Sequence, residues 1–391
     1  MLLVGGDATY VWLFAFPRSL LPKAPKPNAE RVVRGPRLAI SEDLMESLGM
    51  VRTRLPHPGL RVTLLTLGRY TKTHTALIRL QGVADSVLES ELLSRLRRID
   101  VDEIVDTAEI SHYIADGPWS PFPTIQPTER LDTVLFGVVD GRFALLSDGT
   151  ETGLLVPTRY ADLMVSPEDY YLSPYMASFA RLMRYVGSVA AITLPSFYIG
   201  LVTIHPELIP TPLVLAIARS RTGVPFPTFL EVLLMELTIE LIREAGLRLP
   251  SSLSTAVTIV GALVLGQAVV AAGIISAPVV IVVAVTALAS FVMPQYETAF
   301  TIRLLRFPVM VLAAVTGLLG IFWYLAMLLA HMCQLRSLGV PYLAPFGPVR
   351  TRAISDSFVS VPLWRSLLRP LFAQANRVRR SRSTRPLEPV H

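Results

Sequence analysis

This sequence has very little cysteine, and one long stretch of it has no charged residues. Cys333 is the only cysteine among 391 residues, which excludes an intrachain disulfide framework and a metal site built from several thiolates. Residues 249–296 contain no Asp, Glu, Lys or Arg. A bilayer core needs about 20 apolar residues for each helical span, so this charge-free run is long enough for two spans. Gly273 and Pro278 lie near its middle, where a tight turn has to fall.

Catalytic signatures are missing as well. The chain has no His-Glu-x-x-His spacing, no nucleophile elbow and no phosphate-cradling glycine loop. His205 and Glu207 fall in HPELIPTPL (205–213). Its prolines fix φ, and we interpret the segment as a rigid turn rather than a chemical site. We therefore predict that the protein is not an enzyme and needs neither a cofactor nor a metal.

The composition divides the chain into two parts. Hydrophobic residues make up 52% of the chain and charged residues only 17%, with a mean hydropathy of +0.50. A soluble domain carries about 25% charged residues. The apolar excess is concentrated after residue 180. This distribution predicts an α/β (α+β) cytoplasmic N-terminal region followed by an all-α polytopic membrane domain surrounded by lipid.

The N-terminal region is predicted to form two subdomains, 1–120 and 121–180. Apolar residues recur there with helical and strand periods. Four prolines between Pro118 and Pro127 interrupt the pattern, and we interpret this stretch as a linker between the subdomains. The predicted elements are, in chain order, helix 42–54, strands 61–68 and 75–81, helices 85–99, 101–115 and 128–139, and the hairpin of strands 143–146 and 153–156.

The membrane domain is predicted over 181–345. Arg181 and Arg184 precede its first span, and ten arginines follow its last. Cytoplasmic flanks of membrane spans are enriched in Lys and Arg, so both termini are predicted to be cytoplasmic and the number of crossings is even. The same rule explains the basic, partly disordered tail, 346–391, better than nucleic-acid binding does. The four predicted spans are 185–204, 253–272, 276–293 and 308–331.

A helix predicted at 226–245 carries too many charges for a simple lipid-facing span, and we place it at the interface or re-entrant. Glu236, Glu240 and Glu244 recur every four residues on one face, and Glu231 lies nearer the helix start. Like charges at this spacing are destabilising, so water, cations or arginines must offset them. Two interpretations stay open: a solvated face, or an acidic vestibule or gating contact for cations. The arginines of neighbouring segments that could offset these acids are Arg221, Arg303 and Arg306.

The predicted span 253–272 has small and hydroxyl residues along one stripe. Such a stripe allows either close packing between helices or a narrow water-filled lumen, and packing is the commoner explanation. If it lines a lumen, this span is the pore. The candidate pore-lining residues are Ser254, Thr258, Gly261, Leu265 and Ala268.

Several segments share their order and spacing with one known family. They include PFPTIQPTER (121–130), RTGVPFPTFLEVLLMELTIELIREAG (221–246) and LRSLGVPYLAP (335–345). In these segments the chain closely resembles the A subunits of GerA-type spore germination receptors and the related A-like subunit encoded with the dipicolinate channel. The resemblance extends from VVRGPR (32–37) to about Pro348. Members of that family usually carry a further N-terminal stretch that completes the first subdomain, so either the start of this sequence is mis-assigned or the first subdomain is shortened here.

The resemblance implies a complex in the inner membrane of bacterial endospores. In it the A subunit assembles with a transporter-like B subunit, which binds the nutrient, and with a lipoprotein C subunit. It also implies that A subunits form an oligomeric cation channel, a pentamer, which releases ions when nutrient binds. This favours the lumen interpretation of the stripe in 253–272. Two members of the family stay open as alternatives: a receptor A subunit and the dipicolinate-channel-associated relative.

Two other classes of function stay open. A secondary transporter of amino acids or ions commonly shows internal repeats with broken helices, and four spans without a repeat disfavour it. A non-conducting membrane scaffold that only anchors its partners is the other. Single-channel conductance of the reconstituted protein separates the three classes.

Overall fold

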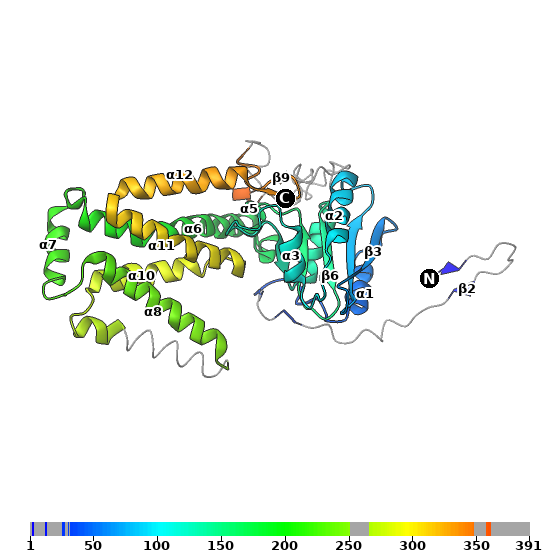
Figure 1. The fold of residues 1–391 in the computed structure, drawn as a ribbon, viewed down its shortest axis with the longest axis horizontal. Helices are drawn as coiled ribbons and strands as arrows, with labels where there is room; N and C mark the ends of the chain where they lie inside the picture. Colours follow the sequence, from blue (N-terminus) through cyan, green and yellow to red (C-terminus); the bar gives the residue numbers. More distant parts are fainter. Residues whose placement is uncertain are drawn as a thin grey trace, which may run out of the picture.

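An α/β domain and an elongated helical bundle lie end to end in the computed structural model (Figure 1). The structure describes residues 2–3, 12–13, 26–27, 30, 32–250, 266–347 and 357–360. Two short strands near the start, β1 (Leu2–Leu3) and β2 (Trp12–Leu13), pair with each other in antiparallel register. The remaining elements divide between the α/β domain and the helical bundle.

The α/β domain is built on one antiparallel sheet of five strands in the order β3-β4-β6-β7-β5. Successive side chains of a strand point to opposite faces. Leu77 therefore faces one side of the sheet and Ile78 the other, and both are fully buried. A strand that is apolar on both faces needs a helical layer on each side. The strands are β3 (Leu60–Leu67), β4 (Thr73–Leu80), β5 (Gln126–Thr128), β6 (Phe143–Ser147) and β7 (Gly153–Val156).

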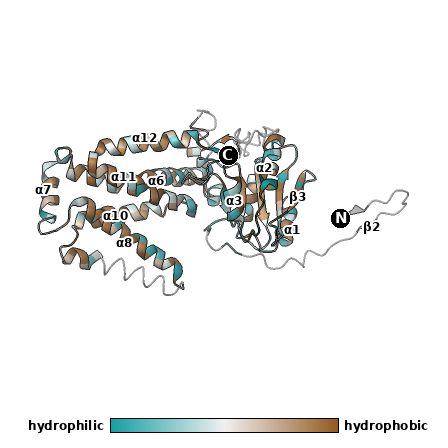
Figure 2. Cartoon of the chain, viewed as in Figure 1, coloured by the Kyte–Doolittle hydropathy of each residue, from teal (hydrophilic) through white to brown (hydrophobic). Residues whose placement is uncertain are grey.

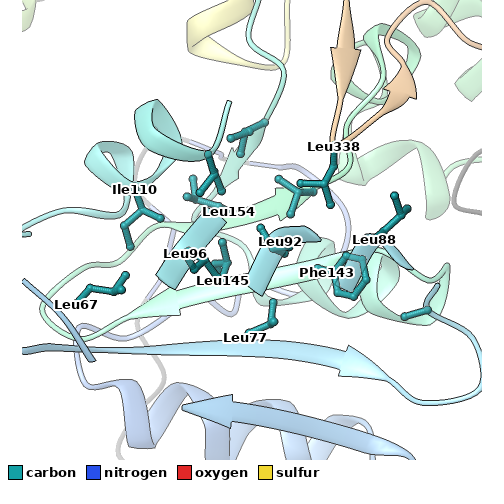
Figure 3. Close-up of a cluster of buried hydrophobic side chains, with 14 of the residues drawn as sticks. Leu67, Leu77, Leu88, Leu92, Leu96, Ile110, Phe143, Leu145, Leu154 and Leu338 are labelled. Atoms are coloured by element: carbon teal, nitrogen blue, oxygen red, sulfur yellow. The ribbon is translucent and has the colours of Figure 1, made fainter. Parts of the chain in front are cut away.

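Four helices supply these layers. Leu92 and Ile110, of α2 and α3, pack on one face with Leu145 and Leu154 of the sheet (Figure 3). The opposite face is covered by α1 and α4. Each of α1, α2 and α3 begins after an aspartate whose carboxylate accepts a hydrogen bond from a backbone N–H of the first turn. The helices are α1 (Leu44–Arg54), α2 (Ser86–Arg98), α3 (Thr107–Ile114) and α4 (Leu131–Val139).

This single sheet differs from the two subdomains predicted from the sequence. β4 lies before the proline-rich stretch and β6 after it, yet the two strands pair in register from Thr75–Ser147 to Ile78–Ala144. Both strands are apolar on both faces, so each buries more surface in the middle of a common sheet than at the edge of a separate one. The prolines between 118 and 127 therefore lie within one domain.

The helical bundle begins at α6. Pro174 occupies the first helical position, where its missing N–H has no intrahelical partner to lose. By length and composition α6 and α11 are long and apolar enough to cross a membrane, and α7, α10 and α12 are shorter apolar helices. A four-residue helix, α5 (Tyr160–Leu163), lies in the segment that leads to the bundle. The bundle helices are α6 (Pro174–Thr203), α7 (Thr211–Ser220), α8 (Thr228–Arg248), α10 (Ala277–Ser290), α11 (Tyr296–Thr316) and α12 (Leu318–Gln334).

The predicted spans agree with the described helices only in part. The region predicted as one span, 308–331, is divided between α11 and α12 at Gly317, whose backbone (φ 66°, ψ −142°) ends one helix and begins the next. Such a conformation is open to glycine and disfavoured for other residues. The predicted spans 185–204 and 276–293 coincide largely with α6 and α10. Most of the predicted span 253–272, residues 253–265, lies outside the described residues.

Hydrophobic residues predominate along the helices of the bundle (Figure 2). Large side chains that are more than half exposed include Val315, Leu319, Phe322 and Trp323. Contiguous exposed apolar surface of this kind indicates contact with lipid or with another protein.

The segment after α12 returns to the α/β domain. It forms a small hairpin, β8 (Arg336–Ser337) and β9 (Val340–Pro341). Leu338, at its turn, packs into the same hydrophobic cluster as the sheet (Figure 3). The Ser337 hydroxyl donates to the Thr124 carbonyl and accepts from the Thr158 N–H at 2.9 Å. Residues 335–341, predicted as part of the membrane domain, therefore tie the end of α12 to the α/β core.

Candidate functional site

A buried ionic network joins α8 to α11 inside the bundle. Glu236 and Glu240 lie one turn apart on α8, and Arg303 and Arg306 lie one turn apart on α11. The two helices are held together by an apolar cluster that includes Val232, Met235 and Met310, together with Val279 and Val283 of α10. The charged side chains meet because the apolar residues of both helices pack on the same neighbours.

Arg306 is the centre of this network. Its Nη1 atom lies 2.7 Å from Glu236 Oε2, and its Nη2 lies 3.2 Å from Glu240 Oε1. Arg303 Nε lies 3.6 Å from the same Glu240 oxygen. The Arg306 and Glu236 side chains are 1% and 0% exposed, whereas Glu240 is 26% exposed. A buried charge is tolerated only when it is paired, so Arg306 and Glu236 depend on each other.

Glu231 belongs to a separate buried site at the other end of α8. Its Oε2 atom accepts hydrogen bonds from the Ser276 N–H at 2.9 Å and from the Ser276 hydroxyl at 2.8 Å. Its Oε1 accepts from Arg221 Nε at 3.2 Å. Ser276 immediately precedes α10, and Arg221 immediately follows α7. One buried carboxylate thus connects α7, α8 and α10.

Of the three alternatives that the sequence left open for offsetting these acids, namely water, cations or arginines, the structure places arginines beside Glu231, Glu236 and Glu240. Glu244, the last acid of the predicted stripe, points outward and pairs with Arg248 at 2.6 Å on the exposed surface. The structure brings Glu236 and Glu240 together and places Glu231 and Glu244 elsewhere. Their role in ion movement stays a proposal.

Most of the predicted pore-lining residues lie outside the described residues. These are Ser254, Thr258, Gly261 and Leu265. Ala268 is described, and it is exposed in a helical segment just before the turn at Gly273. Its carbonyl accepts a hydrogen bond from the Ala272 N–H at 2.8 Å.

The proline-rich segment after α6 forms a turn, as expected, but it then continues into α7, a helix that the sequence analysis did not predict. His205 Nδ1 lies 3.3 Å from Glu207 Oε1, and the pair is partly exposed. Within the described ranges, no group of three or more His, Cys, Asp or Glu side chains is placed to hold a metal.

Sequence reasoning missed Asp169 as the partner of the arginines at the start of the bundle. Asp169 lies on a 3₁₀ turn, Pro167–Tyr170, and is buried. Its carboxylate accepts from Arg181 Nε at 3.1 Å and from both terminal nitrogens of Arg184, at 2.6 and 2.9 Å. No local pattern links an acid to arginines 12 and 15 residues later across the start of a helix, so sequence offered no signal for this contact.

A second polar cluster links the α/β domain to the start of α11. The Glu30 carboxylate accepts from the Thr128 hydroxyl at 2.7 Å and from Gln295 Nε2 at 3.4 Å. Arg130 Nη1 donates to the Glu30 carbonyl at 3.3 Å. Burial disfavours the charged carboxylate and raises the pKa of Glu30 to about 7, against the lowering effect of the Thr128 hydrogen bond. This carboxyl therefore titrates near neutral pH at the junction of the two parts.

Comparison with known proteins decides the family. A family model described as "Bacillus/Clostridium GerA spore germination protein" matches residues 8–372, nearly the whole chain. The chain belongs to the GerA family. Among relatives of this GerA-family chain, spore germination protein A1 of Bacillus subtilis (strain 168) is 40% identical over 338 residues, covering 86% of this chain and 70% of the relative. Spore germination protein KA of the same organism is 39% identical over 362 residues, covering 92% and 66%.

A third relative, named "Uncharacterized membrane protein YfkQ" in Bacillus subtilis (strain 168), is 39% identical over 345 residues, covering 88% of the GerA-family chain and 67% of the relative. The chain thus spans about two thirds of the length of these relatives. A solved structure, the N-terminal domain of the A subunit of the Bacillus megaterium spore germinant receptor GerK3, is 36% identical. The match covers 31% of this chain and 97% of that domain, with a TM-score of 0.26.

Proposed function

We propose that this chain is the A-type membrane subunit of a nutrient germinant receptor of bacterial endospores. The observation that carries the proposal is the GerA family match over residues 8–372. The structure supports it with a bundle that contains two helices long and apolar enough to span a bilayer and that exposes apolar side chains. In such a receptor the chain assembles with copies of itself, as a pentamer, and with a transporter-like B subunit and a lipoprotein C subunit.

In this proposal the bundle crosses the inner membrane of the spore, and the α/β domain lies on the cytoplasmic side. The apolar surface of α11 and α12 then faces lipid or a neighbouring subunit. The ten arginines from Arg336 onward favour a cytoplasmic C-terminus. A cysteine placed at Ser383 should react only with reagents that reach the cytoplasm. Labelling of that cysteine by an impermeant reagent from outside would contradict this topology.

The proposed activity is a cation channel whose pore is lined by 253–272. A narrow apolar ring does not stay wetted and holds ions back, so we propose Leu265 as the gate. Leu265→Ala should widen the ring and let cations leak without nutrient. Leu263 is the matched control, because residues two apart lie about 200° apart around a helix, and its alanine variant should not leak. If neither variant raises basal ion flux, the stripe is a packing surface and the pore lies elsewhere.

The network between α8 and α11 supports a bracing role for Glu236 and Glu240 in this channel. Both carboxylates are held by arginines, and α8 immediately precedes the proposed pore segment. We propose that the network holds the cytoplasmic half of α8 against α11, which restricts how the pore segment moves. The partly exposed Glu240 is the member that can also contact cations.

Single-channel recording of the purified, reconstituted chain tests the channel proposal directly. Discrete cation currents from the chain alone support it. Substrate-coupled uptake without unitary currents would indicate a secondary transporter instead. If the folded, reconstituted chain gives neither unitary currents nor substrate-coupled uptake, the result would indicate a scaffold.

A further inference from the structure

Arginines outnumber acids where α8, α10 and α11 come together near the α/β domain. Arg243, one turn after Glu240 on α8, lies within electrostatic range of Arg303, Glu240 and Arg306. Three arginines thus face two glutamates, Glu236 and Glu240. Glu244, the next acid of α8, is paired with Arg248 on the exposed surface. The network therefore carries a net charge of one positive.

Some guanidinium nitrogens of this positively charged network lack a hydrogen-bond acceptor. Among the described residues, four buried guanidinium nitrogens make no hydrogen bond: Arg243 Nε, Arg243 Nη1, Arg306 Nε and Arg303 Nε, the last of which lies 3.6 Å from Glu240 Oε1 in an ion pair. The Arg303 and Arg306 side chains are 8% and 1% exposed. A buried donor left unpaired costs about 1–3 kcal/mol, and more when it is charged. Arg243 Nη2 donates to the Ser290 hydroxyl at 3.3 Å, and both carboxylate oxygens of Glu236 also lack a hydrogen bond. Because three arginines face only two glutamates, the donors of Arg243 and Arg303 leave room for a further acceptor that carries negative charge.

Exposed apolar rings surround these donors. The Arg243 guanidinium lies 4.6 Å from the centre of the Phe291 ring, and Arg303 lies 5.5 Å from that of Phe300 and 5.9 Å from that of Tyr296. All three rings are more than half exposed. A ligand that fits this site has an anionic group for the arginines and an apolar part for the rings. Inorganic phosphate provides only the first.

The level of the site along the bundle also favours a lipid. The first turns of α11 contact the α/β domain, because the Thr301 hydroxyl donates to the Pro121 carbonyl and Gln295 donates to Glu30. Arg303 lies only two residues beyond Thr301. In the membrane placement proposed above, on which this inference rests, that level is the cytoplasmic surface of the bilayer. Basic pockets between helices at this surface bind anionic headgroups.

We propose that Arg243 and Arg303 bind the phosphate of an anionic phospholipid in the leaflet next to the α/β domain. The phosphate accepts hydrogen bonds from the unpaired guanidinium nitrogens and balances the excess positive charge. The acyl chains lie along the exposed rings of Phe291, Tyr296 and Phe300. A bound lipid of this kind fastens the cytoplasmic ends of α8, α10 and α11 to one another.

The test measures lipid binding to the purified full-length chain in a neutral detergent by native mass spectrometry. The probes are phosphatidylglycerol, phosphatidylcholine and inorganic phosphate. The wild-type chain should retain phosphatidylglycerol in preference to phosphatidylcholine, and millimolar inorganic phosphate should not displace it. Arg243→Gln should weaken phosphatidylglycerol binding about tenfold, the loss expected for one charge-assisted contact.

Two variants serve as controls. Arg243→Lys keeps the charge and should retain most of the binding, which a purely structural role for Arg243 does not predict. Arg248→Gln removes the same charge from an exposed side chain five residues later on the same helix and should leave binding unchanged. Arg243 is only half-buried, so its replacement tests the site without leaving a large cavity in the core. Circular dichroism checks that each variant is folded.

Equal phosphatidylglycerol affinity in wild type and a folded Arg243→Gln variant would overturn the proposal. Equal retention of phosphatidylcholine would do the same, and so would displacement by inorganic phosphate, because the apolar contacts would then contribute nothing. The assay does not depend on ion flux. A chain that binds the lipid but does not conduct refutes the channel and leaves the lipid site in place, and the reverse result refutes only the lipid site.

Discussion

Removing the carboxylate of Glu236 is the sharpest perturbation of the buried network. In the Glu236→Gln variant, Arg306 keeps only Glu240 as an acidic partner, at 3.2 Å, and shares it with Arg303. Arg306 is 1% exposed, so water cannot replace the lost partner. Breaking a buried ion pair from one side costs about 3–5 kcal/mol. Because Glu240 remains, we expect the free energy of unfolding to fall by about 3 kcal/mol.

Two matched variants define this expectation. Replacing both members, Glu236→Met with Arg306→Met, leaves no unpaired charge, and Glu240 keeps Arg303. Apolar replacement of a whole buried pair is often neutral or stabilising, so the double variant should be more stable than Glu236→Gln. Glu244→Gln removes a carboxylate eight residues along the same helix from an exposed pair, and exposed pairs contribute about 0–1 kcal/mol.

The assay is reversible unfolding of the purified chain in mixed detergent micelles, with ion release from spores recorded in parallel. The bracing role predicts that Glu236→Gln lowers both stability and complex abundance. An open acidic vestibule predicts normal stability with reduced ion release. If the free energy of unfolding of Glu236→Gln lies within about 1 kcal/mol of the wild-type value, the bracing argument is refuted. A double variant no more stable than the single one would refute it as well.

Three further predictions concern other parts of the chain. Gly317→Ala should destabilise the bundle by about 2 kcal/mol or more, because φ is 66° and a Cβ would lie 2.7 Å from His205 Nε2. The control is Gly49→Ala, whose Cβ meets no atom within 4 Å. Thermal unfolding measures the stability of both variants. Asp169→Asn should cost about 3 kcal/mol, because the buried carboxylate that joins the α/β domain to α6 is lost; a loss below about 1 kcal/mol in denaturant unfolding would contradict this pairing. The Glu30 carboxyl, with its pKa raised from 4.5 to about 7, binds its proton more tightly in the folded state, so stability should fall as pH rises from about 5 to 7. Glu30→Gln should flatten that part of the pH–stability profile, and an unchanged slope would show that another group titrates there.

Local patterns predicted much of the secondary structure. The strand period of 61–68 and the helical stripe of 85–99 match β3 and α2 within about one residue, because side-chain alternation depends only on near neighbours. The hairpin of strands 143–146 and 153–156 was predictable from an equally local signal, because its turn contains Gly149, whose φ of 80° is a conformation that glycine adopts readily.

Long-range pairing was not predictable from these patterns. Nothing in the proline-rich stretch 118–127 indicates that β4 and β6 share a sheet, because strand pairing depends on the surface that both strands bury together. Gly317 is one of several glycines in apolar surroundings. It breaks the helix because it lies against His205 and Gly200 of the α6 end, where its missing side chain allows a close approach.

The sequence by itself determined the class of this protein: an α/β region followed by apolar helices, in segments whose order and spacing identify the GerA family. It also indicated that water, cations or arginines must offset the acids of α8, because like charges one turn apart repel. Only the tertiary structure decided which acids are buried and with which arginines. Glu236 and Arg306 lie 70 residues apart, and they meet because the apolar faces of α8 and α11 pack on common neighbours. The same packing leaves guanidinium nitrogens of Arg243 and Arg303 without a hydrogen bond, a property of three helices together that no single helix encodes.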